Sequence, residues 1–414
     1  MDLAAIDLTD PDLFGDGPPH AAYRALRDEA PVHWHAPTPT TPDGEGFWCL
    51  TRHDDVAWAA KQGDLFSSAT GGGRDGGGTL IEDLPLGFAA GVLFNMQDDP
   101  RHHHIRRLVT PTLSPRRLRA MEAALAQRCA TILDGVLDEG GCDLLVDVAA
   151  ELPLQAIASL LGVPQENRHR FMAWADSTLD YEDRNPGETS PRAAEAAAEM
   201  FAYSDELLAE KRRCPADDLM GIIANAELPP AAEPGGPLQP LEQQMFFTLL
   251  VAAGSETTRN AIAGGLLALH DRPEQWEALR ADRALLPSAV EEVLRFTSAT
   301  IYNRRTATAE VERHGTLIRP GDKVVLWWQA ANFDERAFDR PLELDIARTP
   351  NHHLAFGVGS HFCLGANLAR LEIALVLGQI LDRVSSIELT GAVERTRSNK
   401  HAGYRHVPVR LHPA

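Results

Sequence analysis

The feature that most restricts how this 414-residue chain can fold is one long helical run near its middle. The run reads LEQQMFFTLLVAAGSETTRNAIAGGLLALHD over residues 241–271, and Pro240 and Pro273 bound it. A helix of this length is longer than a small domain is wide, so the rest of the chain must pack around it. Glutamine, glutamate and arginine side chains interrupt the run, which disfavours a membrane span. We therefore expect a helix at the centre of a large core.

Helical periodicity also dominates the rest of the chain. Apolar residues recur three and four positions apart in segments 19–30, 114–140, 144–162 and 191–213, which is the pattern of amphipathic helices. The β-like pieces are short and few: PVHWHA, GFWCLTR, HGTLIRPGDKVVLWW and YRHVPVRLHP. The sequence therefore predicts a mostly α fold with small β-sheets (α+β). Because no linker or repeat divides it, we expect one domain over residues 1–414.

Charge and cysteine usage narrow the class of protein. The formal net charge of -20 opposes general affinity for nucleic acid. The acidic N-terminal residues lack the basic and apolar regions of a signal peptide, so we expect a cytoplasmic protein without a membrane anchor. The five cysteines are far apart and form no C-x-x-C pair, which excludes a zinc ribbon and disfavours a disulfide framework.

One cysteine, Cys363, stands in an unusual setting, the stretch AFGVGSHFCLGANLAR. A small buried thiol is the usual fate of a lone cysteine. Such a thiol does not need Gly357, Gly359 and Gly365 beside it. Glycines at this density indicate a tight turn, or a close approach of the backbone to something flat or bulky.

Three functional interpretations of Cys363 stand beside the structural one. A nucleophile would use His361 as its base, but no third residue orients that base. Zinc would need further ligands nearby. The third interpretation is a thiolate ligand of haem iron, which pushes electron density onto the metal. Cys363 opens a predicted helix over residues 363–381, and the dipole and free N–H groups of a helix N-terminus favour a thiolate.

The stretch FGVGSHFCLG resembles the haem-binding loop of the cytochromes P450, in the form typical of soluble bacterial members. The residues in register are Phe356, Gly357, Gly359, His361, Cys363, Gly365 and Ala369. The resemblance implies haem b (iron protoporphyrin IX), held between the long central helix and the cysteine loop with its helix. Cys363 is then the metal ligand, and Phe356, Gly357 and Gly365 contact the haem.

The central helix carries a second motif of this family, AGSETT, over residues 253–258. Its resemblance to the oxygen-activation segment places Ala253 and Gly254 at the haem. Gly254 removes a side chain where a small ligand must fit beside the helix. Thr257 can bond the carbonyl four residues earlier or turn towards the ligand and water, and Glu256 can relay protons from solvent. The resemblance implies that both are catalytic; the alternative is two ordinary helix-surface residues.

The motif EEVLR supplies a third point of resemblance. Glu292 and Arg295 are three residues apart and share a helix face. In the family pattern this pair is buried, and a later arginine, here Arg348, completes it. The resemblance implies a structural role, because breaking a buried ion pair is strongly destabilising.

The segment DDPRHHHIRRLV supplies the fourth. His102 and Arg106 take the positions that donate to a haem propionate, and His104 stands where another arginine is usual. The resemblance adds Arg305 and His361 to the propionate contacts. A metal site on the three adjacent histidines is disfavoured, because neighbouring residues point in different directions around a helix.

The resemblance covers nearly the whole chain and implies a haem-thiolate monooxygenase. Such an oxidoreductase inserts one atom of O2 into a small hydrophobic substrate, here by hydroxylation of a sterol, terpenoid, fatty acid or secondary metabolite. Two alternatives use the same haem: a peroxygenase that needs no reductase, and a ligand-binding protein without turnover. Glu256 and Thr257 favour oxygen activation, because peroxygenase members usually lack this acid–alcohol pair.

Electrons must come from a separate protein, since no flavin or ferredoxin module is fused to the chain. The resemblance implies a ferredoxin with its reductase. Segment 101–119 is locally basic, and we expect Arg106 to face the haem while other arginines dock the partner. The docking candidates are Arg107, Arg116, Arg117 and Arg119. A solvated basic helix face is the alternative. We expect a monomer that binds neither nucleic acid nor a membrane.

The resemblance also places the substrate pocket among loop 67–96, the central helix near 249–257, residues 299–301 and the terminal hairpin near 400–402. The candidate wall residues are Leu249, Ala253, Ala299, Thr300, Ile301 and His401. The Gly-rich stretch SSATGGGRDGGGTL reads as a mobile loop at the pocket entrance.

Two wall positions depart from an all-apolar pocket. The sequence looks closest to actinobacterial members that act on sterols, terpenoids and branched lipids, yet Lys400 and His401 stand where apolar residues are common. Ala299 also stands where proline is frequent. A carboxylate or phenol on the substrate is one interpretation, and two side chains that face water is the other.

Overall fold

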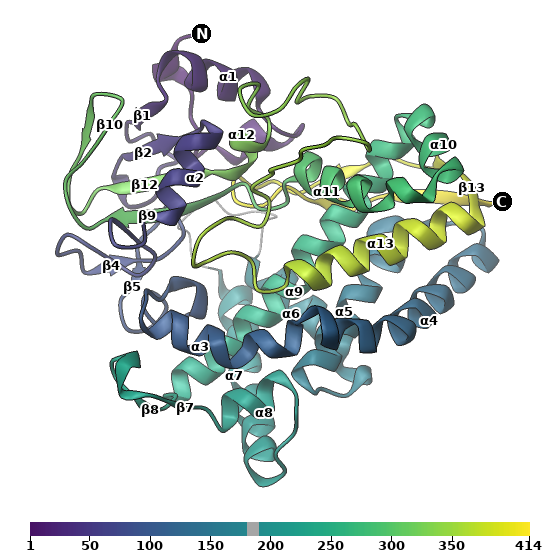
Figure 1. Cartoon of the computed structure of the whole chain (residues 1–414), viewed down its shortest axis with the longest axis horizontal. Coiled ribbons are helices and arrows are strands. Elements are labelled where there is room, and N and C mark those ends of the chain that lie inside the picture. The colour runs from purple at the N-terminus through teal and green to yellow at the C-terminus, as the bar shows by residue number, and fades with distance from the viewer. Residues whose placement is uncertain (180–189) are drawn as a thin grey trace.

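The computed structural model describes residues 1–179 and 190–414. Helices dominate it, and the largest sheet lies to the left in Figure 1, beside the N-terminal segment. The helices are α1 His20–Glu29, α2 His53–Lys61, α3 Arg101–Val109, α4 Pro115–Glu139, α5 Glu151–Leu161, α6 Arg168–Leu179, α7 Pro191–Arg213, α8 Leu219–Ala224, α9 Pro240–His270, α10 Pro273–Ala281, α11 Leu286–Thr297, α12 Trp328–Asn332 and α13 Ala366–Arg383. The predicted mostly α fold with small sheets is confirmed.

Helix α9 runs through the centre of the molecule, as predicted. A capping box begins it: the Gln239 N–H donates to the Glu242 carboxylate at 2.9 Å, and Pro240 stands in the first turn. The helix contacts α5, α6, α7, α11 and α13. Residues 258–269 are buried without exception. The long run in the sequence therefore forms the axis of the helical core.

The largest sheet has the strand order β1-β2-β12-β9-β3. Its strands are β1 Val32–His35, β2 Phe47–Leu50, β12 Lys323–Trp327, β9 Tyr302–Ala307 and β3 Phe66–Ser67. β12 pairs in parallel with β2 and antiparallel with β9. The sheet therefore joins an early segment of the chain to a late one.

Smaller sheets tie further segments together. The three-stranded sheet β13-β16-β6 is built from Val384–Leu389, Pro408–Pro413 and Cys142–Asp143. The two-stranded ones pair β10 Val311–Arg313 with β11 Thr316–Ile318, β14 Glu394–Arg395 with β15 Tyr404–His406, β4 Gly76–Gly77 with β5 Leu84–Pro85, and β7 Glu227–Leu228 with β8 Gly236–Pro237. The pairing of β16 with β6 links the end of the chain to residues just before α5.

Glu292, Arg295 and Arg348 meet in a buried network. The Arg295 Nε and Nη2 atoms donate to the two oxygens of Glu292, each at 2.8 Å, and Arg348 Nε donates to Glu292 at 3.0 Å. Glu292 and Arg295 are fully buried. Arg295 also donates to the carbonyls of Asn332 and Pro341. Because every charge has a partner, the network ties α11 to the segment that precedes the cysteine loop.

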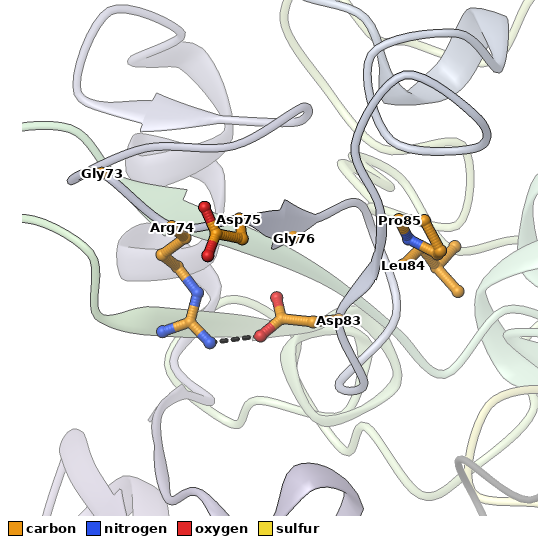
Figure 2. Close-up of a pocket in the computed structure, with 7 residues that line it drawn as sticks. All are labelled: Gly73, Arg74, Asp75, Gly76, Asp83, Leu84 and Pro85. Atoms are coloured by element: carbon orange, nitrogen blue, oxygen red, sulfur yellow. Dashed lines mark hydrogen bonds and ion pairs between the residues drawn. The ribbon is translucent and has the colours of Figure 1, made fainter.

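The Gly-rich segment expected to be mobile is restrained by ion pairs. Arg74 donates to Glu45 at 2.8 Å and also pairs with Asp83, as Figure 2 shows for Asp83. Lys323 of β12 is fully buried and lies 2.8 Å from Asp43. Residues 73–76 and 83–85 line a surface pocket of about 550 Å³. The sequence analysis did not predict this attachment, because its carboxylates come from separate segments.

One helical stretch in the described part of the chain is long and apolar enough to cross a membrane. It covers Leu144–Leu161, and 72% of it is buried inside the fold. It begins with a π-helical segment, Leu144–Ala149, which leads into α5. Its apolar side chains belong to the main hydrophobic core.

Candidate functional site

The loop around Cys363 folds back on itself. The Cys363 N–H donates to the Phe356 carbonyl at 2.8 Å, and the Gly357 N–H to Leu354 at 2.9 Å. Gly357 and Gly359 have φ values of 65° and 87°, which favour glycine. A Cβ on Gly359 would also lie 2.6 Å from the Ala60 carbonyl oxygen. Two of the three glycines are therefore required by the loop itself.

The thiol of Cys363 lies just before α13. Helix α13 begins at Ala366, three residues later than the predicted helix, because Cys363 belongs to the loop. Cys363 is exposed, although protein surrounds it closely. Burial raises the pKa of its thiol, while the N–H groups of Gly365 and Ala366 and the charge of Arg106 act in the opposite direction. Coordination to a metal cation would deprotonate such a thiol.

Behind this loop lies a charge network that the sequence analysis missed. The Arg370 guanidinium stacks on the Phe356 ring at 4.7 Å and donates to Glu291 at 2.6 Å. His353 lies 3.1 Å from the same carboxylate. These bonds hold the pKa of Glu291 down at about 2 despite its burial. Arg370 ends the quoted cysteine stretch, but its partners come from other segments and left no signal there.

Helix α9 presents small side chains in its middle. Ala253 is exposed, and Gly254 and Thr257 are half-buried. The Thr257 hydroxyl donates to the Ala253 carbonyl at 3.2 Å. A Cβ at Gly254 would lie 3.0 Å from Ile157, so the absence of a side chain there also lets α5 approach α9. In the middle of α9, the partly exposed positions from Ala253 to Thr257 therefore carry small side chains.

Glu256 has a partner that the sequence did not predict. Its carboxylate lies 3.0 Å from His401 Nδ1, and its side chain is only 3% exposed. His401 was expected to line the substrate pocket, and its side chain is 15% exposed. The two residues are far apart in the sequence, and only the fold brings them together.

The predicted pocket segments 299–301 and 400–402 lie side by side. The Ile301 N–H donates to the Lys400 carbonyl at 2.9 Å, and the Ala402 N–H to Ala299 at 2.8 Å. Ala299 and Thr300 are half-buried, and Leu249 is half-buried on α9. Ile301 corrects the prediction: it is 1% exposed and packs in an apolar cluster with Tyr302 and Trp327. Ile301 therefore supports the pocket wall without lining it.

Four basic side chains converge from three segments: His102 and Arg106 from α3, Arg305 from β9, and His361 from the cysteine loop. The rings of His102 and His361 stack with their centroids 4.0 Å apart. Burial and the charges of Arg305, His102 and Arg106 lower the pKa of His361 to about 2. Arg305 is 5% exposed, and burial lowers its pKa to about 10. An anion bound among these groups would offset their mutual repulsion.

Among the docking candidates, Arg107 borders this basic cluster. Arg107 lines a groove of about 490 Å³ together with Arg106, Gly359 and Ser360. Arg116 and Arg119 are exposed on α4. Arg117 is already engaged, since it lies 3.2 Å from the Asp217 carboxylate.

The residues present fit an iron porphyrin. The Cys363 thiol, which stands just before the N-terminus of α13, would hold the iron, as in haem–thiolate proteins. The partly exposed positions in the middle of α9 carry small side chains, and the basic cluster matches the two carboxylates of a haem. This donor set supports the haem interpretation of Cys363 over the other three.

Comparison with known proteins agrees with this geometry. The family described as Cytochrome P450 matches residues 165–403. The chain is 46% identical over 411 residues to cytochrome P450 126 of Mycobacterium tuberculosis, covering 99% of this chain and 98% of that protein. It is 36% identical over 403 residues to the steroid C26-monooxygenase of Rhodococcus jostii, covering 95% and 82%. A solved cytochrome P450 of Mycobacterium marinum, in complex with pseudoionone, superposes with a TM-score of 0.87 at 32% identity and 98% coverage of both chains.

The chain belongs to the cytochrome P450 family and is a haem-thiolate monooxygenase. The predicted family, fold, enzyme class and cofactor are thereby confirmed. The assignments of individual site residues remain predictions.

Proposed function

We propose that this cytochrome P450 hydroxylates a mainly apolar molecule of sterol, terpenoid or branched-lipid type, using electrons from a separate ferredoxin. The observation that carries the proposal is the cysteine loop beside the cluster of His102, Arg106, Arg305 and His361. Helix α9 adds the acid–alcohol pair Glu256 and Thr257. Relatives support the substrate type. One is a methyl-branched lipid omega-hydroxylase of Mycobacterium tuberculosis, 35% identical over 418 residues.

Haem, when bound, supplies the chemistry that activates O2 and inserts one oxygen atom into a C–H bond. In this proposal Cys363 is its protein ligand, held by the N–H groups of Gly365 and Ala366. Phe356 and Gly357 support the loop around that ligand. The four basic side chains described above bind the propionates with charge-assisted hydrogen bonds.

Thr257 and Glu256 of α9 deliver the protons that the reaction needs. The Thr257 hydroxyl now donates to its own helix at 3.2 Å, a weak bond that it can exchange for one to oxygen or water. Glu256 stands next to it in the chain and relays protons through its carboxylate. His401 positions that carboxylate from the terminal hairpin, 3.0 Å away.

Arg107, Arg116 and Arg119 form the proposed ferredoxin-docking surface. They are exposed, and Arg107 borders the groove beside the cysteine loop. Arg117 contributes less, because Asp217 already neutralises it. A positive surface of this kind steers an acidic protein towards the haem.

A cytoplasmic, monomeric, single-domain enzyme completes the proposal. Its support is the packing of α4 on α13 and the pairing of β6 with β16, which join the first half of the chain to its end. Sedimentation at several protein concentrations tests the monomer.

Three experiments test the function. The CO-bound, reduced spectrum of the purified protein reports thiolate ligation, and a spin-state screen of ferric protein against sterols, terpenoids and branched fatty acids identifies ligands. Hits are then incubated with a surrogate ferredoxin system or with hydrogen peroxide alone. Product with the ferredoxin system supports the proposal; product only with peroxide indicates a peroxygenase, and binding without product indicates a ligand-binding protein.

A further inference from the structure

The ammonium group of Lys400 is held by the backbone of two other segments. Its Nζ donates to the Tyr302 carbonyl at 2.5 Å and, more weakly, to the Thr79 carbonyl at 3.5 Å. It also stands 4.3 Å from the centroid of the Tyr302 ring. An ammonium has three N–H donors, and these contacts use two of them.

Lys400 differs from the other enclosed lysines in its counter-ion. Lys323 has the Asp43 carboxylate at 2.8 Å, and Lys211 has Asp218 at 2.5 Å. Within the described part of the chain, no carboxylate lies within ion-pair distance of Lys400, and its contacts are two carbonyls and a ring. A buried charge without a counter-ion is costly. The site is therefore incomplete in a way that an anion would correct.

Three charged side chains from other segments act on the ammonium of Lys400. Two carboxylates, Glu256 of α9 and Glu82 of the loop between β4 and β5, attract the ammonium from a distance. Arg305 of β9 repels it. Its neighbour His401 pairs with Glu256 and partly neutralises that acid. Burial lowers the pKa of Lys400 to about 7, although part of its surface stays exposed. The hairpin that carries Lys400 is held against α9 by its neighbour His401, 3.0 Å from Glu256, so the ammonium lies near the space that we assign to the substrate.

We propose that Lys400 is an anion-binding subsite of the substrate pocket and that the substrate is an amphipathic carboxylic acid. The carboxylate would accept the remaining N–H of the ammonium, while the apolar part of the molecule lies towards Ala253 and Leu249 of α9. This inference rests on the proposed function, because it assumes that the space beside α9 is where the substrate binds.

The test compares matched ligands on the haem-loaded protein. Saturated fatty acids, their methyl esters and the corresponding alcohols are titrated at neutral pH, and the ferric spin-state change gives each Kd. The variants are Lys400→Met, Lys400→Arg and, as a control, Lys61→Met, which removes an exposed lysine on α2. A charged hydrogen bond of the usual strength makes Lys400→Met weaken acid binding about 10-fold or more. Ester and alcohol binding should change less than about twofold, Lys400→Arg should retain acid preference, and Lys61→Met should match the parent protein.

Several outcomes overturn the inference. If acids bind the parent protein no better than their esters, Lys400 is not an anion subsite. An equal loss of acid and ester binding in Lys400→Met shows a purely structural lysine. A loss of bound haem in that variant, with an unchanged circular dichroism spectrum, shows that the ammonium serves the haem instead.

Failure of the proposed function looks different. In that case the Lys400-dependent preference for acids persists in the titrations, but no oxygenated product forms with ferredoxin and reductase. If product forms from esters and alcohols and the protein shows no preference for acids, the proposed function is supported and the role of Lys400 is overturned.

Discussion

The cysteine loop and the terminal hairpin contribute to the site in contrasting ways. In the loop, Cys363 and its glycines lie within a few residues of one another, and the bonds that shape the loop are local. In the hairpin, Lys400 and His401 contact groups from three distant segments. The residues common to the family therefore lie within one short segment, whereas the partners of Lys400 and His401 come from distant segments of the chain. This difference teaches that substrate preference is to be sought in the hairpin.

The largest effect is expected from a substitution in the cysteine loop. Cys363→Ser should abolish the CO-bound thiolate spectrum and reduce monooxygenase activity to background, because a hydroxyl is a poor iron ligand. The measurement is the reduced CO difference spectrum with a turnover assay. Cys214→Ser is the control, since Cys214 is exposed on the outside at the end of α7. A variant at 363 with an unaltered spectrum would contradict the assignment.

The Glu292 network should give the next largest effect, on stability. Glu292→Gln leaves Arg295 and Arg348 buried with less than their full counter-charge, so the free energy of unfolding should fall by about 3–5 kcal/mol. Chemical denaturation measures it. Glu388→Gln removes an exposed partner of His412 and Arg410 and should cost less than about 1 kcal/mol. Equal losses in the two variants would show that burial of the network adds nothing.

Substitutions that affect proton delivery should have the next largest effect, and they test whether His401 of the hairpin acts through Glu256. Thr257→Ala and Glu256→Gln should each lower product formed per electron by roughly 10- to 100-fold, and His401→Gln by a smaller factor. If His401 acts through Glu256, the double variant Glu256→Gln/His401→Gln should match Glu256→Gln alone. His412→Gln, which alters an exposed histidine–carboxylate pair, is the control. Additive losses would show that His401 acts independently.

The pH dependence of acid binding gives a more moderate effect. The pKa of Lys400 is lowered to about 7, so its charge is present below that pH and lost as the pH rises through it. Acid affinity should then fall as the pH rises through 7 and level off near the affinity of Lys400→Met, while ester affinity stays level. Glu82, Glu256, Arg305 and His401 also face this region. Lys400→Met should therefore remove the slope; a slope that survives belongs to one of those groups.

The smallest expected effect concerns the redox partner. Arg116→Glu/Arg119→Glu should slow reduction by the ferredoxin about fivefold at low salt, and the difference should shrink as salt increases. Stopped-flow reduction measures the rate, with Arg24→Glu on α1 as the control for an exposed arginine elsewhere. An unchanged rate would place the docking surface away from α4.

Much of the fold could be predicted because its signals are periodic. The run over 241–271 became α9 Pro240–His270, and 191–213 became α7 with the same bounds. The cysteine helix was placed three residues too early, because periodicity does not record where a loop must end. The β-like pieces also formed strands, but their partners were not predictable, since strand order depends on contacts between distant segments.

At the site, prediction succeeded for residue types and failed for neighbours. The four basic residues were found from motifs, and the structure brings them together. Gly254 was assigned to a ligand, and its close approach to Ile157 of α5 was not foreseen. Ile301 was assigned to the pocket surface, yet it is buried. A motif names the residue, but the element packed against that residue decides what it touches.

By itself, the sequence determined the helical architecture, the haem-thiolate chemistry and the acid–alcohol pair, because each depends on spacing along one segment. Only the tertiary structure decided that His401 meets Glu256, that Arg74 restrains the Gly-rich loop, and that Lys400 has no carboxylate partner among the described residues. The physical reason is that charge pairing acts through space over a few ångströms, and residues far apart in the chain come that close only when the core has packed.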